Sequence, residues 1–130
     1  MNRLPARRAG ATPLARGAPP RVPAHLAPYV DVMGAELTVA FLRTFGGVGR
    51  VFTSNPRPDT ELVDMIGLDR ARALGERLGP VATRVPLGKV WVARWLRWNG
   101  ASTSAIARHL HVTDVTVRAY LAAEGARRMR

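Results

Sequence analysis

The segment from Ser102 to Leu121 constrains the fold of this 130-residue chain more than any other part of it. The Ser102 side chain can accept hydrogen bonds from the first free N–H groups of a helix, so we expect a helix to begin there. Ile106 and Leu110 lie four residues apart and form an inward-facing stripe on that helix. Thr113 can cap a second helix, whose expected inward-facing residues are Val117, Tyr120 and Leu121. The segment therefore predicts two short helices that pack on each other.

The turn between these helices falls at His111. Ala107 is small where the second helix must cross the first, and Val112 is expected to fill the space under the turn. From Ile106 to Leu121 the sequence follows the pattern Ile-Ala-x-x-Leu-x-Val-Thr-x-x-Thr-Val-Arg-x-x-Leu, which resembles the helix-turn-helix family closely. The family usually has Gly at the turn. His111 must therefore adopt a left-handed or otherwise unusual backbone, which His tolerates better than branched residues do.

The resemblance implies DNA binding, with the second helix in the major groove and its N-terminal residues at the base edges. Five side chains point outward from this helix and are the expected base contacts: Asp114, Val115, Thr116, Arg118 and Ala119. Arg118 can donate two hydrogen bonds to O6 and N7 of a guanine. Asp114 can accept from a cytosine or hold Arg118. The alternative interpretation is a pair of helices that serves only for packing.

A second set of residues is expected to contact phosphates. Three residues would bind phosphates through their hydroxyl groups and the adjacent helix N-termini: Ser102, Thr103 and Thr113. Five arginines would attract phosphates through their positive charge: Arg94, Arg97, Arg108, Arg127 and Arg128. Arg130 would add to this attraction, which weakens as the salt concentration rises.

The charge of the chain is strongly positive and unevenly distributed. The formal net charge is +11, and Lys89 is the only lysine beside 19 arginines. Residues 1–27 carry +5 without an acidic residue, residues 31–89 are nearly neutral, and residues 90–130 carry +5. Arginine suits phosphates and guanine edges, although a GC-rich genome would produce the same preference over lysine. The distribution indicates a near-neutral part that assembles and basic ends that meet nucleic acid.

The middle of the chain contains a weak internal repeat with a period of 33 residues. Residues 30–53 align without gaps on residues 63–86, with six of 24 positions identical. Each copy has a short apolar stretch ending in Gly, a helix-length segment, a second Gly and a β-prone run. The predicted apolar helical stripes are Leu37, Ala40, Phe41 and Phe45 in the first copy and Leu68, Ala71, Leu74 and Leu78 in the second.

The ends of each repeat predict helix caps and strands. Gly46 and Gly79 stand where a helix favours a left-handed C-terminal residue, and Asp59 or Thr60 can cap the helix of the second copy. The runs 48–53 and 81–85 are predicted strands. Short strands are marginal alone and require a partner edge. A homodimer is the simplest way to supply one.

Three tryptophans precede the helix-turn-helix pattern. Trp91, Trp95 and Trp98 lie on one face of a helix predicted over residues 90–98, which Asn99 and Gly100 end. Apolar stripes at this spacing usually form a core. The functional alternative is base stacking or a partner contact.

These patterns predict a mainly α fold with one or two short β-strands. We expect a disordered basic tail rich in Pro, Ala and Arg over residues 1–27 and a helix–strand dimerisation domain over residues 28–86. A helix-turn-helix domain should follow over residues 87–125, with a basic tail over residues 126–130.

Both domains together resemble the Mor/C family of phage middle and late transcription activators, over roughly residues 28–122. The resemblance rests on the run 63–67 leading into a helix, on Phe45-Gly46-Gly47 before a β-prone run, on residues 78–86 and on the helix-turn-helix. It implies a homodimer that places two helix-turn-helix units in adjacent major grooves and recruits host RNA polymerase.

Several classes of function are disfavoured. Without cysteine the chain cannot form disulfides, thiolate zinc sites or a catalytic thiol. The three histidines form no His–carboxylate pair at metal spacing, and the chain has no nucleophile motif, so we expect neither an enzyme nor a metal or cofactor. No apolar run is long enough to span a membrane. We expect a cytoplasmic, nucleoid-associated regulator that binds double-stranded DNA; the alternative is a DNA-packaging or other nucleoprotein subunit.

Overall fold

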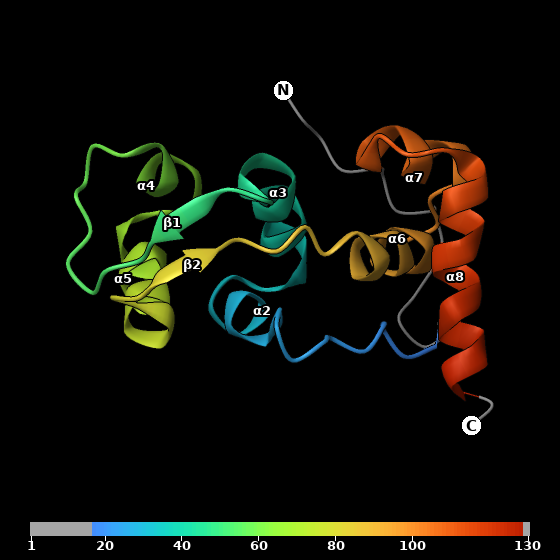
Figure 1. Cartoon of the computed structure of the whole chain (residues 1–130), viewed down its shortest axis with the longest axis horizontal. Coiled ribbons are helices and arrows are strands. Elements are labelled where there is room, and N and C mark those ends of the chain that lie inside the picture. The colour runs from blue at the N-terminus through green and yellow to red at the C-terminus, as the bar shows by residue number, and fades with distance from the viewer. Residues whose placement is uncertain (1–16, 129–130) are drawn as a thin grey trace. The chain divides into compact units, whose positions relative to one another are not determined.

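The computed structural model describes the backbone of residues 17–128 and the side chains of residues 17–122 (Figure 1). The elements in this part of the chain are α2 (Ala27–Met33), α3 (Ala35–Phe45), β1 (Gly49–Val51), α4 (Glu61–Ile66), α5 (Leu68–Leu78), β2 (Ala82–Arg84), α6 (Lys89–Trp98), α7 (Thr103–Leu110) and α8 (Asp114–Arg128). The strands form one antiparallel pair. The predicted fold class, mainly α with short strands, is confirmed.

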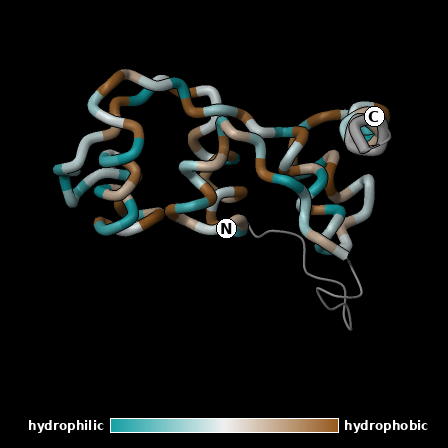
Figure 2. Tube along the Cα trace, turned by 90° about the horizontal axis from the view of Figure 1, so that it is seen from below, coloured by the Kyte–Doolittle hydropathy of each residue, from teal (hydrophilic) through white to brown (hydrophobic). Residues whose placement is uncertain are grey.

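The chain divides into two structural units. The middle unit spans Val22–Gly88, and the C-terminal unit contains α6, α7 and α8 together with residues 17–21. Along the helices, apolar and polar residues alternate, as expected for helices that bury one face (Figure 2). Every helix of residues 17–128 is too short or too polar to cross a membrane.

The 33-residue repeat predicted for the middle unit is a repeat of structure. Helices α3 and α5 both have 11 residues and are displaced by 33 positions, as are β1 and β2. The short apolar stretch of each copy is itself a helix, α2 or α4, which ends at a glycine of similar backbone geometry. Gly34 has φ 79° and ψ 164°, and Gly67 has φ 89° and ψ 158°. Of the two predicted caps, Asp59 and Thr60, it is Thr60 that caps α4, by accepting from the Val63 amide.

The two copies meet at the strands. Arg50 pairs with Thr83, Gly49 with Arg84 and Val51 with Ala82. Backbone hydrogen bonds from Gly47 to Val85 (2.7 Å) and from Val85 to Val48 (2.9 Å) continue the pairing. Each strand therefore finds its partner edge within the same chain. The homodimer expected from the sequence remains a prediction. However, the reason given for it, that each strand needs a partner edge, no longer applies, because the two strands pair within the chain.

Aromatic rings form the centre of the middle unit. The Tyr29 ring lies 5.5 Å from the Phe41 ring and 6.3 Å from the Phe52 ring, measured between centroids. Phe45 packs on Phe41 at 5.1 Å. The largest remaining fully buried side chains of this unit are Leu26, Val39, Ile66, Leu74 and Val85.

The predicted conformation of Gly46 and Gly79 is wrong. Both residues end helices, but their φ angles are −56° and −92°, outside the left-handed region. Close backbone approach explains the glycines instead. A Cβ atom at Gly79 would lie 1.8 Å from the Phe52 carbonyl oxygen, and one at Gly46 would lie 2.4 Å from the Leu42 carbonyl oxygen.

The predicted disordered tail needs a correction at its C-terminal end. Residues 1–16 lie outside the described residues, whereas Leu26 is fully buried in the middle unit. The carbonyl of Pro23 accepts from the amides of Leu26 and Ala27, and Pro28 stands in the first turn of α2. Proline is compatible with a first helical turn, so this proline-rich segment can still enter a fold.

Candidate nucleic-acid interface

Helix α6 forms the core of the C-terminal unit. Trp91 and Trp95 are buried, together with Val92, Ala93 and Leu96, so the predicted packing role of these two tryptophans is confirmed. Trp98 is half-buried and donates its indole N–H to the Gly17 carbonyl at 3.1 Å. Residues on several sides of α6 are buried, and the helix packs against both α7 and α8, so most of its surface serves to position these two helices.

Helix α7 begins as the sequence predicts. The Ser102 hydroxyl accepts from the Ala105 amide at 3.1 Å, and Ile106 and Leu110 face inward. His109 is also buried, which the sequence analysis did not anticipate. Its position three residues after Ile106 places it on the same helical stripe, and this spacing is the signal that could have revealed it.

The sharp turn after α7 has the left-handed backbone expected for His111. Its φ is 57° and its ψ is 46°. The amides of His111 and Val112 both donate to the Ala107 carbonyl, so the end of α7 is closed by backbone hydrogen bonds. This turn redirects the chain into α8.

We expect His111→Gly to raise the free energy of unfolding by about 0.5–1 kcal/mol. The left-handed region costs a residue with a Cβ atom roughly 1–2 kcal/mol, and glycine avoids this steric cost. Part of the gain is offset because glycine loses more conformational entropy than other residues when the chain folds. Urea denaturation measures the difference. The control is Ala119→Gly, at an exposed helical position, which should lower stability by about 1 kcal/mol. Equal destabilisation by both substitutions would contradict the assignment of the turn.

Helix α8 is capped by Thr113 and anchored by Val117. The Thr113 hydroxyl oxygen accepts from the Thr116 amide at 3.1 Å and lies 3.0 Å from the Thr116 hydroxyl. Val117 is fully buried. Tyr120 and Leu121, also predicted to face inward, are only half-buried.

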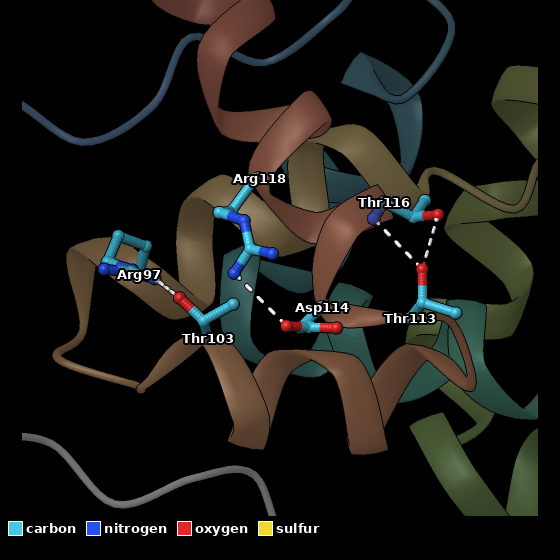
Figure 3. A network of polar contacts seen from close by, with 6 residues as sticks. All are labelled: Arg97, Thr103, Thr113, Asp114, Thr116 and Arg118. Carbon is cyan, nitrogen blue, oxygen red and sulfur yellow. Dashed lines mark hydrogen bonds and ion pairs between the residues drawn. The ribbon is translucent and has the colours of Figure 1, made fainter.

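The first two turns of α8 carry the predicted base-contacting residues, of which Asp114, Thr116 and Arg118 are drawn in Figure 3. Asp114, Val115, Arg118 and Ala119 are exposed, and Val115 retains 64% of its accessible surface. Thr116 is half-buried and turned toward Thr113. Four of the five predicted residues thus lie on an open helical face, which we call the α8 face: Asp114, Val115, Arg118 and Ala119.

Arg118 is held by Asp114 in this structure, which is one of the two roles predicted for the aspartate. The guanidinium lies 3.2 Å from the carboxylate, one helical turn away (Figure 3). Both side chains are more than half exposed. Exposed ion pairs contribute little to stability, so Arg118 can leave Asp114 at small cost when another acceptor is near.

The predicted phosphate contacts divide into three groups. Ser102, Arg108 and Thr113 are exposed, as is Arg97, which donates to the hydroxyl of the half-buried Thr103 (Figure 3). The side chains of Arg127, Arg128 and Arg130 lie outside the described residues.

Arg94 alone forms the third group, because its predicted role as a phosphate contact is wrong. Its Nε donates to the Tyr120 carbonyl at 3.3 Å, and the side chain is half-buried. Arg94 therefore braces α6 against α8 and is not one of the exposed arginines available to phosphates. The sequence places Arg94 off the tryptophan stripe but does not show that α8 covers that position.

Comparison with protein-family models, with curated proteins and with solved structures found no match for this chain. The resemblance to the Mor/C family accordingly stays a prediction. Within the part of the chain that the structure describes, no group of three or more His, Asp or Glu residues is arranged to hold a metal ion.

Proposed function

We propose that the C-terminal unit binds double-stranded DNA with the α8 face in the major groove, and that the protein thereby regulates transcription. The observation that carries this proposal is the exposure of the α8 face on a helix whose other side is anchored by Val117. A helix that served only for packing would have no need of an exposed arginine, aspartate and valine beside a capped N-terminus.

The surroundings of the α8 face support the same proposal. Arg97 and Arg108 are exposed on α6 and α7, and the hydroxyls of Ser102 and Thr113 stand at the N-termini of α7 and α8. Helix N-termini and arginines together are suited to phosphates on either side of a groove. Recruitment of RNA polymerase, which the family resemblance implies, stays a prediction.

A pair of matched valine substitutions tests the proposal. We expect Val115→Glu to weaken binding to a mixed-sequence duplex about tenfold at low salt, because the new carboxylate would face phosphates and base edges. Val81→Glu is the control, since Val81 is 69% exposed in the middle unit and gains the same charge. Fluorescence anisotropy with a labelled duplex gives both affinities. Equal losses would show that net charge alone, and not the α8 face, governs binding.

A further inference from the structure

The pairing of β1 with β2 is symmetrical with respect to the repeat. Since the copies are displaced by 33 residues, Gly49 corresponds to Ala82, Arg50 to Thr83 and Val51 to Arg84. The central pair, Arg50 with Thr83, joins equivalent positions of the two copies. In each outer pair the first residue of one strand lies opposite the third residue of the other: Gly49 opposite Arg84, and Val51 opposite Ala82. The strands are thus related by an approximate twofold axis through the central pair.

This is the arrangement that two identical subunits adopt in a twofold-symmetric dimer. In such an interface residue i of one subunit contacts residue j of the other, and j contacts i in return. Here the two copies of the repeat stand in place of two subunits. The matching geometry of Gly34 and Gly67, each joining two helices, extends the correspondence beyond the strands.

The linker between the two copies packs closely against α5. Residues 52–60 connect β1 to α4, and their backbone passes against α5 at Gly75. A Cβ atom at Gly75 would lie 1.8 Å from the Thr53 carbonyl oxygen, whereas the first copy has Leu42 at the equivalent position. The second copy therefore differs from the first where it receives the linker. This difference favours the pairing of a first copy with a second copy over the pairing of two first copies from different chains.

The outer edges of the strands are poor sites for adding a second molecule. Each strand has three residues and carries one arginine, Arg50 in β1 and Arg84 in β2. Short strands and charged side chains are features by which sheet edges avoid further pairing.

We propose that the middle unit is a dimer-like assembly closed within one chain, and that the protein binds DNA as a monomer with a single helix-turn-helix. Its recognition sequence is then a single non-palindromic site. The inference that the protein binds DNA as a monomer rests on the proposed function. The inference that the middle unit is closed within one chain does not depend on it. The inference is an alternative to the homodimer expected from the sequence, and the same experiment distinguishes the two.

Two measurements on the full chain test this inference. Sedimentation equilibrium over a range of concentrations should give the mass of one chain, 14.1 kDa. Selection from a library of random-sequence duplexes should enrich a motif without inverted symmetry. Adding an inverted second copy of that motif should raise the apparent affinity by no more than about twofold, whereas joining two heads in a stable dimer raises it by roughly 10²–10⁴.

The outcomes separate the two proposals. A mass of two chains, or an enriched palindrome whose halves must both be present, would overturn the inference. A mass of one chain with a non-palindromic motif supports both the closed unit and single-headed binding. A mass of one chain with no enriched motif supports the closed unit but refutes sequence-specific DNA binding, and with it the proposed function.

Discussion

Gly75→Ala is expected to lower the free energy of unfolding by about 3 kcal/mol. A methyl group at this position would lie 1.8 Å from the Thr53 carbonyl oxygen and 2.6 Å from the Ser54 nitrogen, both of them backbone atoms. A clash with backbone can be relieved only by moving the linker or α5, and overpacking of this kind typically destabilises by 1–3 kcal/mol or more. The usual effect of Gly→Ala inside a helix is a stabilisation of about 1 kcal/mol, so the expected sign is reversed.

Urea denaturation of the full chain measures this effect, with Gly49→Ala as the control. Gly49 lies in β1 with no heavy atom within 4 Å of a Cβ atom built there. Its substitution should change stability by less than about 0.5 kcal/mol. If Gly75→Ala proved as stable as Gly49→Ala, the linker would not pass against α5 as described.

Arg118→Ala is expected to reduce affinity for a selected DNA site by about 1–3 kcal/mol, which is roughly 5- to 150-fold. The substitution removes the two-pronged donor of the α8 face and leaves the Asp114 carboxylate without its ion-pair partner. The unpaired carboxylate would then face the DNA and add to the loss. Affinity for random-sequence duplexes should fall much less, so the ratio between selected and random DNA decreases.

Arg108→Ala supplies the comparison for Arg118→Ala. Arg108 is exposed on α7 and is expected to meet a phosphate rather than a base. Its loss should weaken binding to selected and random duplexes alike and lower the slope of log affinity against log salt by about 1. Anisotropy titrations at several salt concentrations give both quantities. Equal losses on both kinds of DNA for Arg118→Ala would show that α8 does not read bases.

The helix-turn-helix could be predicted in detail because its determinants are local. The Ser102 and Thr113 caps and the left-handed His111 depend on neighbours within four residues, and the inward-facing Ile106 and Val117 follow the helical spacing of apolar residues. Such short-range requirements leave a readable pattern in the sequence. The exposed α8 face follows from the same periodicity.

Long-range contacts were not predictable in the same way. The sequence predicts Arg94 to be a phosphate-contacting surface arginine, but in the structure its Nε donates to the Tyr120 carbonyl of α8, 26 positions away. Gly46 and Gly79 end helices as expected, but the reason is the backbone beside them rather than their own φ angles. The sequence shows that a glycine stands at a position, but not whether its conformation or the proximity of other backbone explains it.

The repeat lies between these two cases. Six identities in 24 positions reveal the period, but they do not show that the copies pair with each other. Either two chains or one could satisfy the strands, and the pattern of apolar residues is the same for both. In the structure β1 pairs with β2 of the same chain, in a register centred on Arg50 and Thr83.

The claim that the α8 face lies against base pairs is tested most directly by nuclear magnetic resonance. A ¹⁵N-labelled chain would be titrated with a mixed-sequence duplex at low salt while backbone amide shifts are followed. We expect the largest changes at residues 114–119 and at the N-terminus of α7, with the amides of residues 22–88 nearly unaffected. Changes concentrated in residues 22–88, or no change at any duplex concentration, would contradict the claim.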